Sequence, residues 1–325
     1  MRIAYIIVII STLLASCSKQ KLTTPIRKIE TTANGKINDI YFLNEEKGFA
    51  IGGNRNDNGF ILKTIDGGTT WTLLDSTNYF SKNNVKLQAL NSIVFLNENL
   101  GQIVGHGGKL LRTEDGGKTW DIILNGTWED FYDLQFFDSN ATLLVSGSGL
   151  SNGILFKTNN DWYNLDPEEL DYPARDLEFI DNEIGYMATN GFVKKTYNAG
   201  NTWEYLDING DFFYHIDFPT ATTGYVCGWE GSIHKTTDAG TTWEKQHNTN
   251  QAFSKRHHFE KIDFINESIG LVIGYKGELL YTDNGGGTWK QIITNTDLDF
   301  HSLYFVNNDK AFVGAENGTL FEINF

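Results

Sequence analysis

Apolar and polar residues alternate along this chain in short segments that recur at intervals of roughly 40 to 50 residues. Each recurrence contains an apolar-x-Phe pair. The pairs are Ile40/Phe42, Ile93/Phe95, Leu134/Phe136, Leu177/Phe179, Ile216/Phe218, Ile262/Phe264 and Leu303/Phe305. Alternation at a period of two is typical of a β-strand. The pairs therefore predict one strand at the same place in each of seven repeats.

Each repeat continues with further segments of strand character. An apolar run ending near a glycine comes first, then Gly-x-apolar-x-x-Thr, and then a tryptophan with the residues that follow it. The third segments begin at Gly59, Gly108, Gly153, Gly191, Gly231, Gly277 and Gly318. Four short strands repeated in this way predict an all-β fold, a seven-bladed β-propeller of four-stranded antiparallel blades.

The last repeat ends at Phe325, after its third strand. Residues 25–32 are extended in character and belong to no earlier repeat. We expect this N-terminal segment to supply the missing outer strand of the last blade, because pairing the two ends of the chain removes an exposed strand edge. The predicted propeller domain then spans residues 25–325.

Residues 1–16 combine a positively charged start, a short apolar run and a small-residue end, as secretory signal peptides do. The apolar run is too short for a final membrane-spanning helix. Leu14-Ala15-Ser16-Cys17 resembles the lipobox of bacterial lipoproteins. That resemblance implies an acylated Cys17 that binds the lipid bilayer, with residues 17–24 as the linker. Ser18 after the cysteine implies an outer-membrane protein of the cell envelope, and we expect it to face the periplasm.

Charge and cysteine content exclude some functions. The chain has 26 Lys and Arg against 41 Asp and Glu, for a net charge of −15. Such a charge repels polyanions, so no nucleic-acid partner is expected. Cys227 is the one cysteine left in the mature chain, which excludes an intramolecular disulfide. Its apolar neighbours predict a buried thiol rather than a nucleophile.

A second recurrent phrase, Thr-x-Asp-x-Gly-x-Thr-Trp, follows the third strand of several repeats. Its Asp or Asn can accept hydrogen bonds from turn amides, and its Trp can pack between blades. The predicted structural residues are Asp66, Trp71, Asp115, Trp120, Asn198, Trp203, Asp238, Trp243, Asn284 and Trp289. Calcium binding is the alternative for these turns, but no cluster of acidic ligands accompanies them. We therefore predict no metal and no cofactor.

This phrase is the Asp-box. The order Ile-x-Phe, Gly-x-Ile-x-x-Thr and Asp-Gly-Gly-x-Thr-Trp resembles the photosystem II stability and assembly factor family, a family of Asp-box (BNR-like) propellers, across nearly the whole mature chain. The resemblance implies a non-enzymatic scaffold that engages a partner during assembly. That family is associated with an arginine-rich patch, whereas this chain is acidic and has few arginines. The expected partner is therefore another envelope protein or its precursor.

The Asp-boxes are expected on one face of the propeller, because they all join the third strand to the fourth. The opposite face carries the loops that differ between repeats, and we expect any binding site there. Its aromatic and charged residues resemble those that supply interface energy. The candidate binding residues are Arg55, His106, Trp128, Arg175, Tyr214, Trp229, Glu230, Arg256, His257, Tyr275, Lys276 and His301.

The alternative function is a polysaccharide-binding protein or a glycoside hydrolase, with Trp128 and Trp229 stacking on sugar rings. Hydrolysis needs two carboxyls at a set separation. Acidic residues flank the apolar residue of the first strand in several repeats: Asp39, Asp133, Asp176, Glu178, Asp217 and Asp263. No catalytic residue can be assigned from these positions alone. The sialidase Arg-Ile-Pro motif is absent. His257 and His258, together with His215 and His301, raise the possibility of a metal site, but histidines on a rim are usually solvated.

Overall fold

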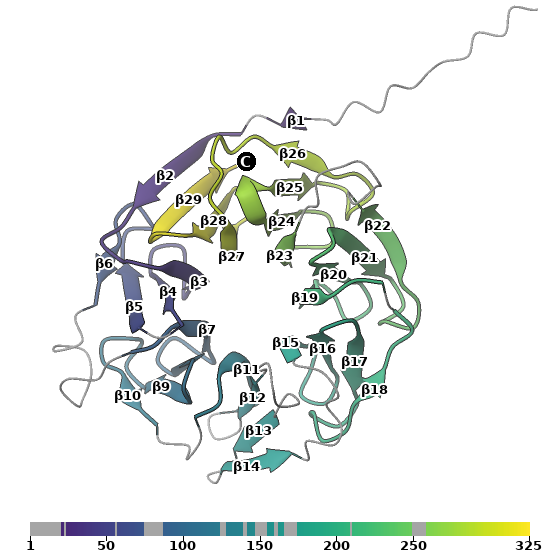
Figure 1. Ribbon diagram of the computed structural model, residues 1–325, viewed down its shortest axis with the longest axis horizontal. Helices are drawn as coiled ribbons and strands as arrows, with labels where there is room; N and C mark the ends of the chain where they lie inside the picture. The colour runs from purple at the N-terminus through teal and green to yellow at the C-terminus, as the bar shows by residue number, and fades with distance from the viewer. Residues whose placement is uncertain are drawn as a thin grey trace, which may run out of the picture.

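The computed structural model describes residues 21–22, 24–55, 57–74, 87–123, 128–138, 142–146, 155–158, 162–165, 174–208, 210–248 and 258–325. Figure 1 shows their strands grouped into sheets that stand around a central axis, as in a β-propeller. In the described part of the chain, no helix is long and apolar enough to cross a membrane.

Six sheets are four-stranded and antiparallel. Five of them take four consecutive strands: β3 (Lys36–Phe42), β4 (Gly48–Asn54), β5 (Asp57–Thr64) and β6 (Thr72–Leu73); β7 (Leu90–Phe95), β8 (Gly101–Gly105), β9 (Lys109–Thr113) and β10 (Asp121–Ile122); β11 (Phe131–Phe136), β12 (Thr142–Ser146), β13 (Leu155–Thr158) and β14 (Trp162–Leu165); β15 (Ala174–Phe179), β16 (Gly185–Thr189), β17 (Val193–Thr196) and β18 (Glu204–Tyr205); β19 (Phe213–Asp217), β20 (Gly224–Gly228), β21 (Ser232–Thr236) and β22 (Glu244–Asn248).

The sixth joins the two ends of the chain. It consists of β27 (Phe300–Asn307), β28 (Lys310–Ala315), β29 (Thr319–Asn324) and the N-terminal strand β2 (Ile26–Glu30). β2 pairs antiparallel with β29, with Ile26 opposite Ile323. Figure 1 shows purple β2 beside yellow β29. The ring is therefore closed by main-chain pairing between the two ends of the chain.

The prediction of seven four-stranded antiparallel blades is wrong. The structure has six blades of that kind, and its remaining sheet is different. That sheet contains β23 (Phe259–Phe264), β24 (Gly270–Gly274), β25 (Leu279–Thr282) and β26 (Lys290–Ile292), with the 3-10 turn η2 (Tyr275–Gly277) between β24 and β25. A fifth strand, β1 (Lys21–Leu22), pairs with β26 in parallel. β1 falls within the segment 17–24 that was predicted as a linker. The repeat pattern contains no signal for this strand, because the strand lies outside the repeats.

Every first strand of a sheet carries a β-bulge at the same place. The register shifts fall between Ile37 and Asp39, Leu90 and Ser92, Phe131 and Asp133, Ala174 and Asp176, Phe213 and His215, Phe259 and Lys261, and Phe300 and Ser302. A bulge inserts one extra residue and re-aims the side chains beside it. Two consecutive residues of each first strand can therefore face the central axis, which regular alternation would not allow.

The Asp-box turns join neighbouring blades. Asp66 accepts hydrogen bonds from the amide and hydroxyl of Thr70, at 2.9 and 2.7 Å, and from the hydroxyl of Thr64 at 2.8 Å. The two bonds from Thr70 lower the pKa of Asp66 to about 2. Gly68 has a φ of 81°, and a Cβ there would lie 2.1 Å from the ring of Phe312 in the adjacent blade. The turn thus needs glycine both for its backbone conformation and for the close approach of the next blade.

The Asp-box tryptophans Trp71 and Trp120 each lie between a phenylalanine of their own blade and one of the adjacent blade. Trp120 is fully buried, and its ring meets the rings of Phe49 and Phe95 edge-on, at centroid distances of 6.2 and 6.0 Å. Trp71 makes the same kind of contact with Phe42 and Phe312. These contacts form part of the apolar layers between the blades.

Candidate functional site

The bulged first strands place three layers of residues around the central axis. The mouth layer consists of Asn38, Asn91, Tyr132, Arg175, Tyr214, Glu260 and His301. The middle layer consists of Asp39, Ser92, Asp133, Asp176, His215, Lys261 and Ser302. The deep layer consists of Tyr41, Val94, Gln135, Glu178, Asp217, Asp263 and Tyr304. Each layer takes one residue per first strand, and the middle and deep layers are two residues apart, so they share a strand face.

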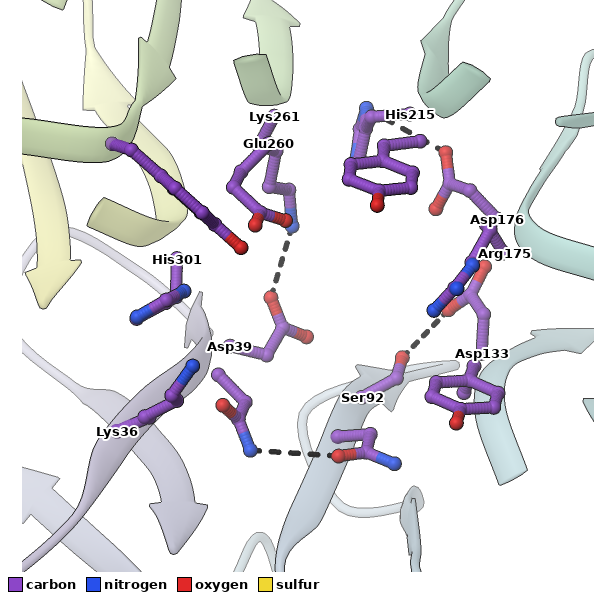
Figure 2. A pocket seen from close by; sticks show the side chains of 15 residues that line it. Lys36, Asp39, Ser92, Asp133, Arg175, Asp176, His215, Glu260, Lys261 and His301 are labelled. Atoms are coloured by element: carbon purple, nitrogen blue, oxygen red, sulfur yellow. Dashed lines mark hydrogen bonds and ion pairs between the residues drawn. The ribbon is translucent and has the colours of Figure 1, made fainter. Parts of the chain in front are cut away.

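A cavity of about 310 Å³ opens at the channel mouth. The mouth layer, most of the middle layer, and the neighbouring Lys36 and Tyr275 line it. Figure 2 shows the labelled side chains converging on this space from strands all around the ring.

The mouth lies at the beginning of the first strands. The Asp-box turns bond instead to the loops that follow these strands, for example through the Gly116 amide and the Asn99 carbonyl. The cavity is therefore on the face opposite the Asp-boxes.

Three carboxylates of the middle layer each tie one first strand to the next. The pairs of acceptor and amide donor are Asp39 with Ile93 at 3.0 Å, Asp133 with Leu177 at 2.9 Å, and Asp176 with Ile216 at 2.8 Å. Each donor amide follows the bulge of its strand, where the regular ladder is interrupted. These three carboxylates satisfy buried backbone groups and so have a structural role in the ring.

The middle layer also holds a buried ion pair. Lys261 donates to Asp39 at 3.0 Å across the channel, as Figure 2 shows. Burial opposes the charge on Lys261, but Asp39 and Asp176 outweigh it and hold the pKa of the lysine above its usual range. The neighbouring His215 has its Nδ1 3.5 Å from Asp176. Burial holds the pKa of His215 well below its usual value, so this imidazole is neutral at pH 7.

Several channel carboxyls are held partly in the protonated form. Burial raises the pKa of Asp133 and of Asp263 to about 6. Burial, with the nearby charges of Asp133 and Asp263, raises the pKa of Glu178 to about 8. The pKa of Asp217 is also raised well above its usual value, first by burial and then by Asp263. A buried carboxyl keeps its proton when too little positive charge is close by to stabilise the anion.

Aromatic rings line one side of the mouth. Trp229 lies 3.8 Å from His258, 5.5 Å from Tyr275 and 5.7 Å from Tyr214, measured between ring centroids. Tyr275 continues this contact to His301 at 6.2 Å. Trp229 is half-buried within this group.

Arg175 extends the aromatic surface to a further blade. Its guanidinium lies 5.2 Å from the ring centroid of Tyr214 and 5.5 Å from that of Tyr132. Its Nε also donates to the side-chain oxygen of Asn190 at 3.4 Å. We call the set Tyr132, Arg175, Tyr214, Trp229, His258, Tyr275 and His301 the aromatic arc.

The model of one protein family matches this chain. That family is described as photosynthesis system II assembly factor YCF48, and the match covers residues 18–127 and 195–299, together more than half of the chain. The chain belongs to the YCF48 family. No curated protein sequence matches it at a significant level.

Solved structures of YCF48 share the fold. A YCF48 structure bound to a D1 peptide has a TM-score of 0.75 and 19% identity, covering 95% of this chain and 100% of that one. YCF48 from Cyanidioschyzon merolae has a TM-score of 0.72 and 16% identity, covering 92% and 98%. The GH74 xyloglucanase from Xanthomonas campestris also reaches 0.72, at 13% identity, but only 54% of that chain is covered. At these identities the similarity shows the fold alone.

In this YCF48-family chain, four of the predicted binding residues line the mouth cavity: Arg175, Tyr214, Tyr275 and His301. A fifth, Trp229, lies beside the lining and contacts Tyr214 and Tyr275. The other described candidates lie outside the cavity lining. Arg55 and His106 share Asp130, at 3.2 and 2.9 Å, on the outer part of this face.

Trp128 is 85% exposed and lines no part of the mouth cavity. Glu230 is exposed, and its amide donates to Asp211. Lys276 is exposed too, and its amide donates to Asp299. Arg256, His257 and the lipidation candidate Cys17 lie outside the described residues. Within those residues, no group of three His, Cys, Asp or Glu side chains is arranged to hold a metal ion.

Sequence reasoning missed Glu260 and Lys261, which are central to the site. The signal that identifies them is a break in alternation. In Phe259-Glu260-Lys261-Ile262, two polar residues separate the buried ones, where a regular strand would have one. The same break occurs at Phe213-Tyr-His-Ile216 and marks the bulge there. Aligning the repeats on this break would have placed both residues at the channel mouth.

Proposed function

We propose that this YCF48-family chain is a non-enzymatic protein-binding scaffold, and that its partner is an envelope protein or the precursor of one. The partner docks at the channel mouth. The observation that carries the proposal is the aromatic arc around the cavity. Tyr, Trp and Arg dominate the energetics of protein interfaces, and here they gather on one side of a concave site.

Two further points support a binding role. The fold relative whose structure contains a D1 peptide is itself a protein that binds a protein segment. The middle-layer carboxylates that a glycosidase would need are occupied by backbone amides of the neighbouring strands. Trp229 presents no open face to a sugar ring on the side where His258 lies 3.8 Å away. These features favour a protein segment over a polysaccharide.

We place this scaffold in the cell envelope, attached to the outer membrane through acylated Cys17 and facing the periplasm. The lipobox-like Leu14-Ala15-Ser16-Cys17 supports attachment. The first described strand, β1, begins four positions after Cys17 and pairs with the outer edge of a blade. The anchor would therefore join the ring at its rim and leave the channel mouth free.

The test compares peptides and glycans as ligands. The purified protein is screened against a displayed random peptide library and a glycan array, together with the variants Trp229→Ala and Trp128→Ala. We expect selected peptides to bind the wild-type protein and Trp128→Ala equally, and to bind Trp229→Ala at least about tenfold more weakly. Specific glycan binding that requires Trp229, without peptide binding, would refute the proposal.

A further inference from the structure

We propose that the cavity at the channel mouth receives a lysine or arginine side chain of the protein partner, held by Glu260 beside the rings of Tyr214 and Tyr275. This inference rests on the proposed function, because it requires a peptide at the mouth. It adds to that proposal that the partner residue entering the cavity is positively charged.

The charges of the cavity favour a cationic guest. Four carboxyls line it, Asp39, Asp133, Asp176 and Glu260, against the three cations Lys36, Arg175 and Lys261. Lys261 is already bonded to Asp39. The seven deep-layer positions add Glu178, Asp217 and Asp263 and no cation. A positive group entering from the mouth therefore moves towards buried carboxyls that are partly protonated for lack of a nearby cation, and its charge would stabilise their ionised form, whereas an anion would oppose it.

The aromatic side chains beside the cavity also favour a lysine or arginine side chain. A cation over the face of an aromatic ring is attracted by the ring's quadrupole, and arginine is the commonest partner. The arc already holds one guanidinium in this way, that of Arg175 against Tyr132 and Tyr214. The rings of Trp229 and Tyr275 continue this surface on the other side of Tyr214.

Glu260 is the carboxylate placed to receive the guest. It belongs to the mouth layer, and Figure 2 shows it pointing into the cavity beside Lys261. Burial raises its pKa, while a hydrogen bond from the Tyr275 hydroxyl lowers it. Among the described residues, the cavity's ion pair joins Lys261 to Asp39, and the neutral His215 lies against Asp176. Glu260 is in no ion pair with another described residue and is left for a cation from outside.

The experiment uses fluorescein-labelled, acetylated and amide-capped hexapeptide pools whose third residue is fixed as Lys, Arg, norleucine or Glu, with random residues elsewhere. Binding to the full chain is measured by fluorescence anisotropy. We expect the Lys and Arg pools to bind at least about tenfold more tightly than the norleucine pool, and the Glu pool to bind most weakly. Glu260→Gln should remove this preference.

A matched variant controls for the net negative charge of the protein. Glu98→Gln removes one carboxylate from an exposed loop on the Asp-box side, and it should leave the preference for Lys and Arg intact. Equal loss of the preference in both variants would overturn the inference. Binding that is independent of the fixed residue, yet lost in Trp229→Ala, would overturn the cationic guest and leave the proposed function standing. Absence of binding by every pool would count against both.

Discussion

Replacing Glu178 with Gln should stabilise this protein at neutral and alkaline pH. Glu178 lies in the deep layer, on β15, where burial and then Asp133 and Asp263 raise its pKa and the more weakly acting Lys261 lowers it. Burial and these two carboxyls raise its pKa from 4.5 to about 8. Glutamine keeps the shape of the side chain and carries no charge, so it avoids the cost of either ionising or protonating the buried carboxyl.

The size of the effect follows from the two pKa values. The folded-state pKa lies above the unfolded value, so the folded state binds the proton more tightly and loses stability as the pH rises from about 4.5 to about 8. Each pH unit in that interval costs about 1.4 kcal/mol. At pH 7 the wild-type protein therefore carries a penalty of up to about 3 kcal/mol from this group, and almost none at pH 4.

The assay is guanidinium chloride unfolding followed by tryptophan fluorescence at pH 4.5 and pH 8. Glu178→Gln should exceed the wild-type protein in the free energy of unfolding at pH 8, and the difference should nearly vanish at pH 4.5. Glu204→Gln, on an exposed outer strand of the same blade, is the control and should change little at either pH. An effect of Glu178→Gln that is the same at both pH values, or destabilisation at pH 8, would refute the assignment of a raised pKa.

Two other outcomes follow from the packing and from the N-terminus. Trp120→Ala should lower the free energy of unfolding by about 3–5 kcal/mol, because it removes a fully buried ring between Phe49 and Phe95, whereas Trp128→Ala should cost little; similar losses in denaturant titrations of the two variants would contradict this. Cys17→Ala should move the protein from the membrane fraction to the soluble fraction of cells, and its retention in the membrane would exclude anchoring by an acylated cysteine.

The repeat pattern predicts the first strand of each sheet well, because the apolar-x-Phe pairs bury their side chains between blades, only Phe179 among them being partly exposed. Ile40 and Phe42 lie in β3, and Ile262 and Phe264 lie in β23, all of them buried. β1 could not be predicted in this way. It is two residues long and is held by pairing with β26, so no periodicity within its own sequence marks it.

The candidate site was predicted less completely than the fold. Variation between repeats pointed to the face where the structure brings Tyr214, Trp229 and Tyr275 together. It did not predict that each bulge lets two consecutive residues of a first strand face the central axis. These residues determine the chemistry of the cavity. Nor could sequence alone separate Asp133, which ties two strands together, from Glu260, which faces the open mouth, because both are acidic residues in first strands.

The residues of the mouth layer contribute both to the stability of the propeller and to the proposed binding site. In the first two sheets its side chains are used for closure. Asn38 donates to the Leu90 carbonyl at 2.8 Å, and Asn91 donates to the Phe131 carbonyl at 2.6 Å. A short amide at this position reaches the neighbouring backbone and fixes the spacing of the two strands.

Across the ring, the same position holds Arg175, Tyr214 and Glu260, whose larger or charged groups extend towards the cavity and the aromatic arc. On that side the ties come from the middle-layer carboxylates Asp133 and Asp176, whereas β3 and β7 are joined both by Asn38 and by the middle-layer Asp39. Closure on that side is therefore made one layer deeper, and the mouth layer is free to carry binding groups. This division predicts where specificity can change between related chains without loss of the fold: at the mouth-layer positions of β15, β19 and β23, and not at the amides of β3 and β7.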